Sequence, residues 1–414
     1  MLRLVSLCGI AVMLALCFVF SKNRRAINWR LVGVGLVLQA VLGFLFLYWS
    51  AGNLALQKFG DGVSNFLALA RDGSNFVFGP LAQGDKVRGV FGPNDGFVFA
   101  FQVLPTLIFF SSFMAVLYHL GIMQMVVRAM AWVMVRVMGT SGSESLSACA
   151  NVFVGQTEAP LLIKPFLKDM TMSELHAIMV GGFATIAGGV FALYVGFGID
   201  AGHLMVGSVM AVPAGLICTK MLWPETETSK TMGSVQKVEA EAYGNVVEAA
   251  AAGAGDGLKL ALNVAAMLVA FLGLVAVANW LLDMLPGGLS IKMILGWLFW
   301  PIAAVMGVQS SEVNTLSQLL GTKIAMTELM AYSDLGPMVK QHTISPRTAM
   351  IASFALCGFA NIGSVAIQIG GLGAMAPERR GDLARLGLRA MFGGAIATCM
   401  TACVAGVLAS EGGA

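Results

Sequence analysis

One glutamate within an apolar stretch constrains most strongly how this chain can fold. Residues 155–160 read Gly-Gln-Thr-Glu-Ala-Pro, and apolar segments at 148–154 and 161–167 lie on either side. Exposing Glu158 to lipid would cost about 2.5–3.5 kcal/mol on insertion scales. Because Gly155 and Pro160 disfavour one continuous helix, we predict two half-helices that meet at a polar tip lining a cavity. The competing interpretation is a surface loop between two soluble core helices.

The composition favours the membrane interpretation. Of the 414 residues, 57% are hydrophobic and 11% are charged, whereas a soluble protein carries about 25% charged residues. Apolar segments near membrane-spanning length recur from end to end, which predicts an all-α polytopic protein in the lipid bilayer. The seven cysteines and four histidines show no metal-ligand spacing, so we assign them no metal site.

The polar tip recurs in the second half of the chain. Thr157-Glu158 precedes Gly-Phe-Ala-Thr-Ile at residues 182–186, and Thr327-Glu328 precedes Gly-Phe-Ala-Asn-Ile at residues 358–362. This ordered pair of matches predicts an inverted repeat whose halves each contribute an acidic tip and a broken helix, as in a secondary transporter.

We predict eight transmembrane helices, two re-entrant helical hairpins and one interfacial amphipathic helix. The spans are expected at residues 4–20, 31–55, 97–119, 173–198, 203–222, 258–282, 348–375 and 391–408. The hairpins are expected at 141–166 and 290–332, with Glu328 near the second tip or on its returning arm. Residues 59–71 fit a helix in the outer interface, and residues 122–138 fit an amphipathic connector at the inner face. The spans at 173–198 and 348–375 should be interrupted.

Basic residues predict the orientation of the chain. Four lie between the first two spans (Lys22, Arg24, Arg25, Arg30), and four more precede the last span (Arg379, Arg380, Arg385, Arg389). The positive-inside rule places both segments in the cytoplasm, so both termini are expected outside. Residues 21–25 lack a small-residue cleavage site, and we therefore expect the first apolar segment to remain as a span.

This order predicts five regions. Residues 1–138 would form N-terminal scaffold helices and the interfacial helix, 139–222 the first repeat, and 223–257 a cytoplasmic linker with some local helix. Residues 258–289 would add a scaffold helix, and 290–414 would form the second repeat.

Residues 141–160, from Ser-Gly-Ser-Glu-Ser-Leu to Asn-Val-Phe-Val-Gly-Gln-Thr-Glu-Ala-Pro, closely resemble the bacterial concentrative nucleoside transporters. The match continues at 184–188 (Ala-Thr-Ile-Ala-Gly), 320–323 (Leu-Gly-Thr-Lys), 327–332 (Thr-Glu-Leu-Met-Ala-Tyr) and 357–364 (Cys-Gly-Phe-Ala-Asn-Ile-Gly-Ser). It spans essentially the whole chain, with the specific motifs between residues 141 and 373. Thr327 departs from the family's usual Asn, which puts its hydrogen bonds in doubt, and Thr185 replaces a common serine but keeps the hydroxyl.

The resemblance implies a homotrimer in the bacterial inner membrane, so the termini that the positive-inside rule places outside would lie in the periplasm. Each protomer would import nucleosides such as uridine through its own site, driven by sodium, or by protons in some members. No nucleic-acid partner is expected.

The resemblance also assigns the substrate site. It places the nucleobase on Gln156, Thr157 and Glu158, with Val190 lining the base pocket. It assigns binding of the ribose hydroxyls to Glu328, Asn361 and Ser364, and it places Phe359 against the sugar or base. Carboxylate, amide and hydroxyl groups complement such a ligand. The competing roles are hairpin-stabilising hydrogen bonds for Thr157 and ordinary packing for Val190 and Phe359.

Sodium is the expected coupling ion. Asn151 and Thr185 would supply side-chain oxygens, and the backbone carbonyls of Val154 and Ile186 would complete the shell where the helices break. The competing role for both polar side chains is helix-packing hydrogen bonding.

Three function classes remain at this point. A secondary active symporter is favoured, because two facing broken repeats suit a gated carrier better than a channel. A membrane-embedded enzyme would use Glu158 and Glu328 as its carboxylate pair, but no nucleophile–base set accompanies them. We therefore expect a transporter and no enzyme, with proton-coupled symport as the nearest variant.

Overall fold

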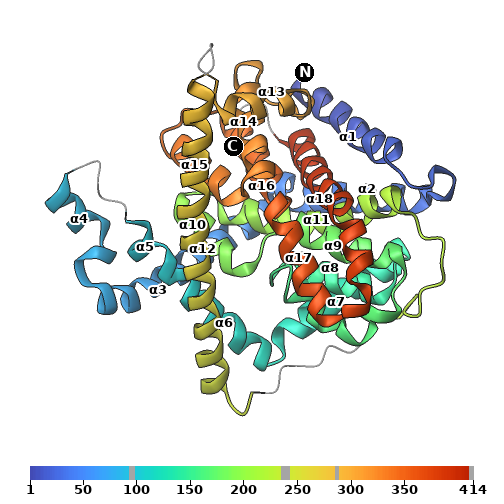
Figure 1. Cartoon of the computed structure of the whole chain (residues 1–414), viewed down its shortest axis with the longest axis horizontal. Helices are drawn as coiled ribbons and strands as arrows, with labels where there is room; N and C mark the ends of the chain where they lie inside the picture. Colours follow the sequence, from blue (N-terminus) through green and yellow to red (C-terminus); the bar gives the residue numbers. More distant parts are fainter. Residues whose placement is uncertain (93–97, 235–242, 285–288, 410–414) are drawn as a thin grey trace.

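The computed structural model describes residues 1–92, 98–234, 243–284 and 289–409, and these residues are predominantly helical (Figure 1). Within these ranges, extended pairing is confined to one isolated bridge between Ser141 and Met232. Five described helical segments are long and apolar enough to cross a membrane: Leu2–Val19, Trp29–Tyr48, Phe99–His119, Ala201–Leu222 and Pro377–Leu408. They coincide with five of the eight predicted spans, so the all-α membrane class is confirmed.

The N-terminal half forms eleven α-helices in the described residues. They are α1 (Leu2–Val19), α2 (Trp29–Gly43), α3 (Ser50–Phe78), α4 (Gly84–Phe91), α5 (Phe99–Gln102), α6 (Leu104–His119), α7 (Ile122–Met138), α8 (Gly142–Ala150), α9 (Met172–Ala184), α10 (Gly188–Phe197) and α11 (Ala201–Leu222). The predicted connector at 122–138 coincides with α7.

Two predicted bounds near the N-terminus were wrong. The second span was predicted to reach residue 55, but a π-helical turn at Phe44–Tyr48 ends it and Trp49 adopts an extended conformation. The interfacial helix was predicted at 59–71, whereas α3 starts directly after this bend and extends to Phe78. Gly52 permits the bend, because a side chain there would collide with the Leu45 carbonyl.

The linker predicted at 223–257, with some local helix, contains the start of a long helix. Its helix α12 (Val246–Asp283) begins well before residue 258, capped by the Asn245 side chain, which accepts a hydrogen bond from the Glu248 backbone N–H. The alanine-rich sequence of this segment favours helix, which explains the early start. Residues 235–242 of the predicted linker lie outside the described residues.

The second hairpin differs from the prediction of 290–332. Helix α13 (Ile291–Ala304) is a separate element that packs along α14 (Val313–Ala325), and the arms of the hairpin are α14 and α15 (Glu328–Lys340). The tip is Met326-Thr327, as the acidic motif predicted. Thr327 caps α15 by accepting from the Met330 backbone N–H at 3.3 Å, so threonine sustains a helix start at this position.

Both predicted helix interruptions are present. The first lies between α9 and α10, and the second separates α16 (Pro346–Leu356) from α17 (Ile362–Met375). The two breaks touch, since a Cβ atom on Gly358 would lie 2.6 Å from the Phe183 carbonyl oxygen. Glycine therefore allows the breaks to meet, and α18 (Arg380–Leu408) packs against α9 beside them.

The two arms of the first hairpin are different kinds of helix. Its first arm is α8, and its second arm, Ala159–Asp169, is a 3-10 helix that contains Pro160 and Pro165. Proline lacks the backbone N–H that an α-helix requires, which accounts for this irregular arm.

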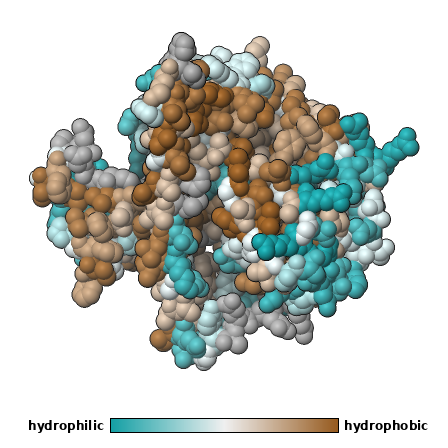
Figure 2. Space-filling model, in the orientation of Figure 1, coloured by the Kyte–Doolittle hydropathy of each residue, from teal (hydrophilic) through white to brown (hydrophobic). Residues whose placement is uncertain are grey.

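A strap of residues 223–234 covers the base of the first hairpin. The Thr231 carbonyl accepts from the Gly142 backbone N–H at 2.9 Å, and Ser229 donates to the Glu174 carboxylate at 2.6 Å. Beneath it, the Lys220 ammonium lies 2.8 Å from the Glu144 carboxylate, and both side chains are buried. Hydrophilic side chains gather on the right in Figure 2, where Figure 1 shows this strap and the α1–α2 loop. The strap is thus folded onto the hairpin, although the sequence of this linker shows no convincing core pattern.

Candidate functional site

The second hairpin tip carries a buried carboxylate with two donors. Glu328 begins α15 and is 4% exposed. One carboxylate oxygen accepts from the Tyr194 hydroxyl at 2.9 Å, and the other accepts from the Asn361 amide Nδ2 at 3.1 Å. The structure therefore unites α10, the second hairpin and the second break at one polar cluster.

Asn361 links this cluster to α17. Its Oδ1 accepts from the Ser364 backbone N–H at 2.8 Å and so caps the helix, while its Nδ2 reaches Glu328. Ser364 is buried in the first turn. Phe359 lies within the break and packs partly buried against the core, and Val190 is buried on α10. The structure thus brings Glu328, Asn361 and Ser364, the three residues that the resemblance assigned to the ribose, close together.

The first hairpin tip contacts α17 from the other side. The Gln156 carbonyl Oε1 accepts from the Gln368 amide Nε2 at 2.9 Å. The Thr157 hydroxyl donates to the Glu158 carboxylate at 3.0 Å, and the Thr157 methyl group approaches Gly371 closely. The tip is therefore held against α17 by a glutamine pair and by a glycine that leaves room for the threonine.

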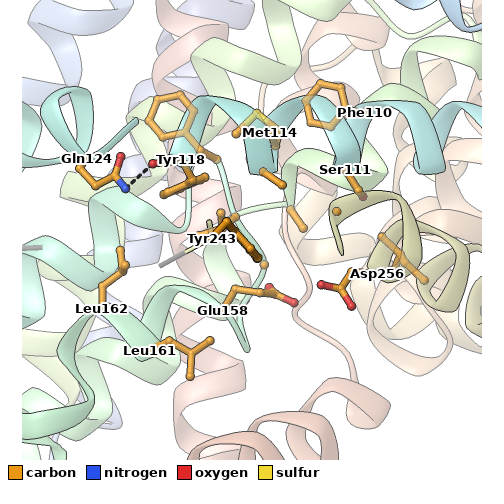
Figure 3. Close-up of a pocket in the computed structure, with 17 residues that line it drawn as sticks. Phe110, Ser111, Met114, Tyr118, Gln124, Glu158, Leu161, Leu162, Tyr243 and Asp256 are labelled. Atoms are coloured by element: carbon orange, nitrogen blue, oxygen red, sulfur yellow. Dashed lines mark hydrogen bonds between the residues drawn. The ribbon is translucent and has the colours of Figure 1, made fainter. Parts of the chain in front are cut away.

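Glu158 occupies a different environment from Glu328. Its side chain is exposed and lines a cavity of 390 Å³ between the first hairpin tip, α6 and α12. In Figure 3 the carboxylates of Glu158 and Asp256 lie toward one another across this cavity, with Tyr118 and Tyr243 nearby. An exposed and a buried carboxylate in separate surroundings do not form the acid–base pair that an enzyme would need.

Asn151 and Thr185 both lie near Gly181, where the first hairpin tip faces α9. A Cβ atom on Gly181 would lie 3.6 Å from Asn151 Nδ2, and the Thr185 hydroxyl donates to the Gly181 carbonyl at 2.9 Å. Asn151 Nδ2 donates to the Ser147 carbonyl at 3.0 Å. Its Oδ1 is buried and has no hydrogen-bond partner among the described residues.

An unpaired buried amide oxygen costs about 1–3 kcal/mol unless a partner satisfies it. The Thr185 hydroxyl uses its proton on Gly181, so its lone pairs remain to accept. Val154 follows α8 in the tip, and Ile186 lies in the break between α9 and α10. Neutral oxygens of this kind suit a hard cation such as sodium, so the donor set fits the predicted ion.

Sequence reasoning missed Tyr194 and Gln368. Tyr194 follows Val190 by four residues on the same face of α10, and Gln368 follows Ser364 by four on the same face of α17. This helical spacing from predicted site residues was the available signal. Lys323 is a third buried polar group: its Nζ donates to the Ala355 carbonyl and to the Thr398 hydroxyl, each at 2.8 Å.

Comparisons with known proteins identify the family to which the chain is similar. Family models described as "Na+ dependent nucleoside transporter N-terminus", "Nucleoside recognition" and "Na+ dependent nucleoside transporter C-terminus" match residues 8–81, 100–201 and 203–406. An uncharacterized transporter of Haemophilus influenzae is 44% identical, with 99% of each chain covered. Sodium/nucleoside cotransporter 1 of Mus musculus is 44% identical over 98% of this chain, which spans 64% of the mouse protein's length.

The solved structures of CNTnw show the same fold. Its inward-facing, substrate-bound structure has a TM-score of 0.94 at 44% identity, with 99% of both chains covered. A substituted form in an outward-facing state has a TM-score of 0.93 at 42% identity, covering 99% of this chain and 98% of that one. The predicted resemblance is confirmed: the chain belongs to the concentrative, Na+-dependent nucleoside transporter family.

Proposed function

We propose that this protein imports nucleosides such as uridine across the bacterial inner membrane by symport with sodium. The observation that carries the proposal is the placement of α17 between the two hairpin tips. Its N-cap Asn361 contacts Glu328, and Gln368, seven residues and about two turns further along the helix, contacts Gln156. Seven residues rise about 10.5 Å along a helix, a distance comparable to the length of one nucleoside from its ribose hydroxyls to the far edge of its base.

In this proposal the sugar binds at the second hairpin. The ribose hydroxyls replace the present hydrogen-bond donors to the Glu328 carboxylate. Asn361 and Ser364 provide further polar contacts to the sugar at the N-terminus of α17. Phe359 supplies an apolar wall beside the sugar or base. A hydroxyl that donates to a buried carboxylate makes a charge-assisted hydrogen bond. This bond would favour the binding of ribosides.

The base then binds at the first hairpin. Gln156 and Thr157 present amide and hydroxyl groups from its tip, and Val190 packs as an apolar wall on α10. Glu158 completes the polar rim where it faces the 390 Å³ cavity. We assign this cavity to the aqueous path beside the site, because a carboxylate in a membrane protein is least costly where it lines water.

Sodium is proposed to bind at Asn151, Thr185 and the backbone carbonyls of Val154 and Ile186. The unpaired Oδ1 of Asn151 supports this assignment. Proton-coupled symport is the second candidate, but neither an amide nor an aliphatic hydroxyl titrates near neutral pH. A sodium ion at this position would join the first hairpin tip to the first helix break, so its binding would preorganise the base-binding side of the site.

Replacing Thr185 by valine tests the ion site. Valine keeps the side-chain shape and removes the oxygen, so nucleoside uptake should lose most of its sodium dependence while the protein still folds. The measurement is radiolabelled uridine uptake into proteoliposomes with and without an inward sodium gradient.

A matched control for Thr185→Val is Thr322→Val. Thr322 is buried in α14 and donates to the Gln318 carbonyl at 2.9 Å, the same backbone bond that Thr185 makes within its own helix. The control should keep the sodium dependence of the unsubstituted protein. Unchanged sodium activation in Thr185→Val would remove this residue from the ion site.

We further propose eight spans, two re-entrant hairpins and a homotrimer with one substrate site in each protomer. Residues 1–138 and 258–289 would form the scaffold, and the two repeats at 139–222 and 290–414 would hold the substrate and move against it, with 223–257 as the cytoplasmic connection. The inward- and outward-facing states of CNTnw support alternating access by such a movement.

The proposed orientation can be tested by cysteine labelling. Phe76→Cys, at an exposed position of α3, should react with an impermeant thiol reagent added outside the cell. Met232→Cys, at an exposed position of the strap, should react only after the membrane is permeabilised. Both variants are made in a cysteine-free background. External labelling of Met232→Cys would reverse the proposed topology.

A further inference from the structure

Gln368 is a buried glutamine of α17 that contacts two partners at once. Its Nε2 donates to Gln156 Oε1 at 2.9 Å and to the Met179 carbonyl oxygen at 3.1 Å. The side chain is 1% exposed. Gly182 makes room for the pair, since a Cβ atom there would lie 2.6 Å from Gln368 Nε2 and 2.8 Å from Gln156 Cβ.

The Met179 carbonyl determines which way both amides face. A backbone carbonyl oxygen only accepts, so the Gln368 atom that contacts it must be the NH₂ group. The same NH₂ group contacts Gln156, whose atom at that contact must therefore be its oxygen. Turning either amide over would place two acceptors or two donors face to face.

The arrangement leaves Gln368 itself incompletely satisfied. Its Oε1 is buried without a hydrogen-bond partner among the described residues. The pair thus retains an unpaired buried oxygen, which is unfavourable in free energy. The same arrangement holds the Gln156 amide in a single orientation. Gln156 then directs its NH₂ group away from Gln368.

We propose that Gln368 is a positioning residue for base specificity. It holds Gln156 so that the site offers the nucleobase a hydrogen-bond donor and selects bases with an acceptor at that point, a keto oxygen or an unprotonated ring nitrogen. This inference rests on the proposed contact between Gln156 and the base. A glutamine free to rotate would serve donors and acceptors alike, whereas a held glutamine rejects a base that presents N–H there.

Three nucleosides test the proposal. Uridine, cytidine and isocytidine carry carbonyl, amino and ring-nitrogen groups in different orders along the same base edge. Wherever Gln156 meets that edge, at least one of the three presents N–H in place of an acceptor. Their kcat/KM values for sodium-driven uptake into proteoliposomes should differ at least about 10-fold in the unsubstituted protein, which corresponds to about 1.4 kcal/mol.

Gln368→Leu should reduce this discrimination to within about 3-fold, because it frees the Gln156 amide to turn over. Should Gln368→Leu not reach the membrane, Gln368→Met removes the same amide with an unbranched side chain of similar length and carries the test. Gln156→Leu should lose the discrimination too, and the Gln156→Leu/Gln368→Leu double variant should show no further loss, since the two residues act through one contact.

Gln39→Leu is the matched control. Gln39 is also a fully buried glutamine whose Nε2 donates twice, to the Met210 carbonyl and the Thr401 hydroxyl, each at 3.1 Å, and whose Oε1 is unpaired within the described structure. Its loss removes the same kind of hydrogen bonds from α2. Gln39→Leu should keep the base discrimination of the unsubstituted protein.

Two outcomes would overturn the inference alone: equal uptake of all three nucleosides by the unsubstituted protein, or unchanged discrimination in Gln368→Leu while Gln156→Leu abolishes it. If Gln156→Leu leaves the discrimination intact, the base contact proposed for Gln156 fails, and the role of Gln368 falls with it. The Gln156 variant therefore distinguishes failure of the inference from failure of the proposed site.

Discussion

Replacing Glu328 by glutamine is expected to weaken nucleoside binding about 10- to 150-fold while leaving the fold intact. Hydrogen bonds to charged groups are worth about 1.5–3 kcal/mol, and each 1.4 kcal/mol is a factor of about ten in affinity. Glutamine keeps the size of the side chain and can still accept from Asn361 Nδ2, while its own NH₂ group can donate to the Tyr194 hydroxyl. Equilibrium binding of uridine to the purified variant measures the change.

A nucleoside that lacks one ribose hydroxyl shows whether Glu328 reads the sugar. The unsubstituted protein should bind this analogue less well than uridine, and Glu328→Gln should distinguish the two much less. Glu312→Gln is a control, because the Glu312 carboxylate also accepts two hydrogen bonds, from the backbone N–H and hydroxyl of Ser345. If Glu328→Gln weakens both ligands equally, the ribose contacts belong to Asn361 and Ser364 alone.

Replacing Lys220 by methionine is expected to destabilise the protein by about 3–5 kcal/mol, because it leaves the Glu144 carboxylate buried without a cation. Glu144 is fully buried at the base of the first hairpin, and one of its oxygens contacts Lys220 at 2.8 Å. The thermal unfolding temperature of the detergent-purified protein measures the loss, at one scan rate for all variants.

The double variant Glu144→Gln/Lys220→Met removes both charges and should recover most of that loss. Lys230→Met serves as the exposed comparison: its ammonium lies 3.2 Å from Asp169 with both side chains exposed, and such pairs contribute about 0–1 kcal/mol. A double variant as unstable as Lys220→Met would show that the lysine acts through Ser173 and Glu225 and does not compensate Glu144.

The features that the sequence predicted correctly all carry a local chemical signal. A carboxylate between glycine and proline marked the first tip, and the repeated Thr-Glu motif marked the second. The pentapeptides at 182–186 and 358–362 marked both helix breaks. Asn361 and Glu328 came together because both belong to such motifs.

What the sequence could not show depends on contacts between distant segments. Tyr194 reaches Glu328 across 134 residues, and Gln368 reaches Gln156 across 212 residues. In each case the helical spacing from a predicted site residue indicates a shared helix face but does not identify the distant partner. The contacts of the strap could not be predicted for the same reason, since Ser229 and Thr231 are ordinary polar residues until Glu174 and Ser143 pack against them.

The partners of Glu328 also bear on how fast a carrier of this design can cycle. Tyr194 and Asn361 already satisfy the carboxylate, so a sugar that arrives at the proposed ribose site would exchange hydrogen bonds and not simply add them. The net gain on binding is the difference between two good sets of partners, which keeps affinity moderate. On release, the same two side chains can close on the carboxylate as the sugar leaves, so that it need not pass through an unpaired state. A very tight site would hold its cargo, whereas this exchange lowers the barrier to unloading.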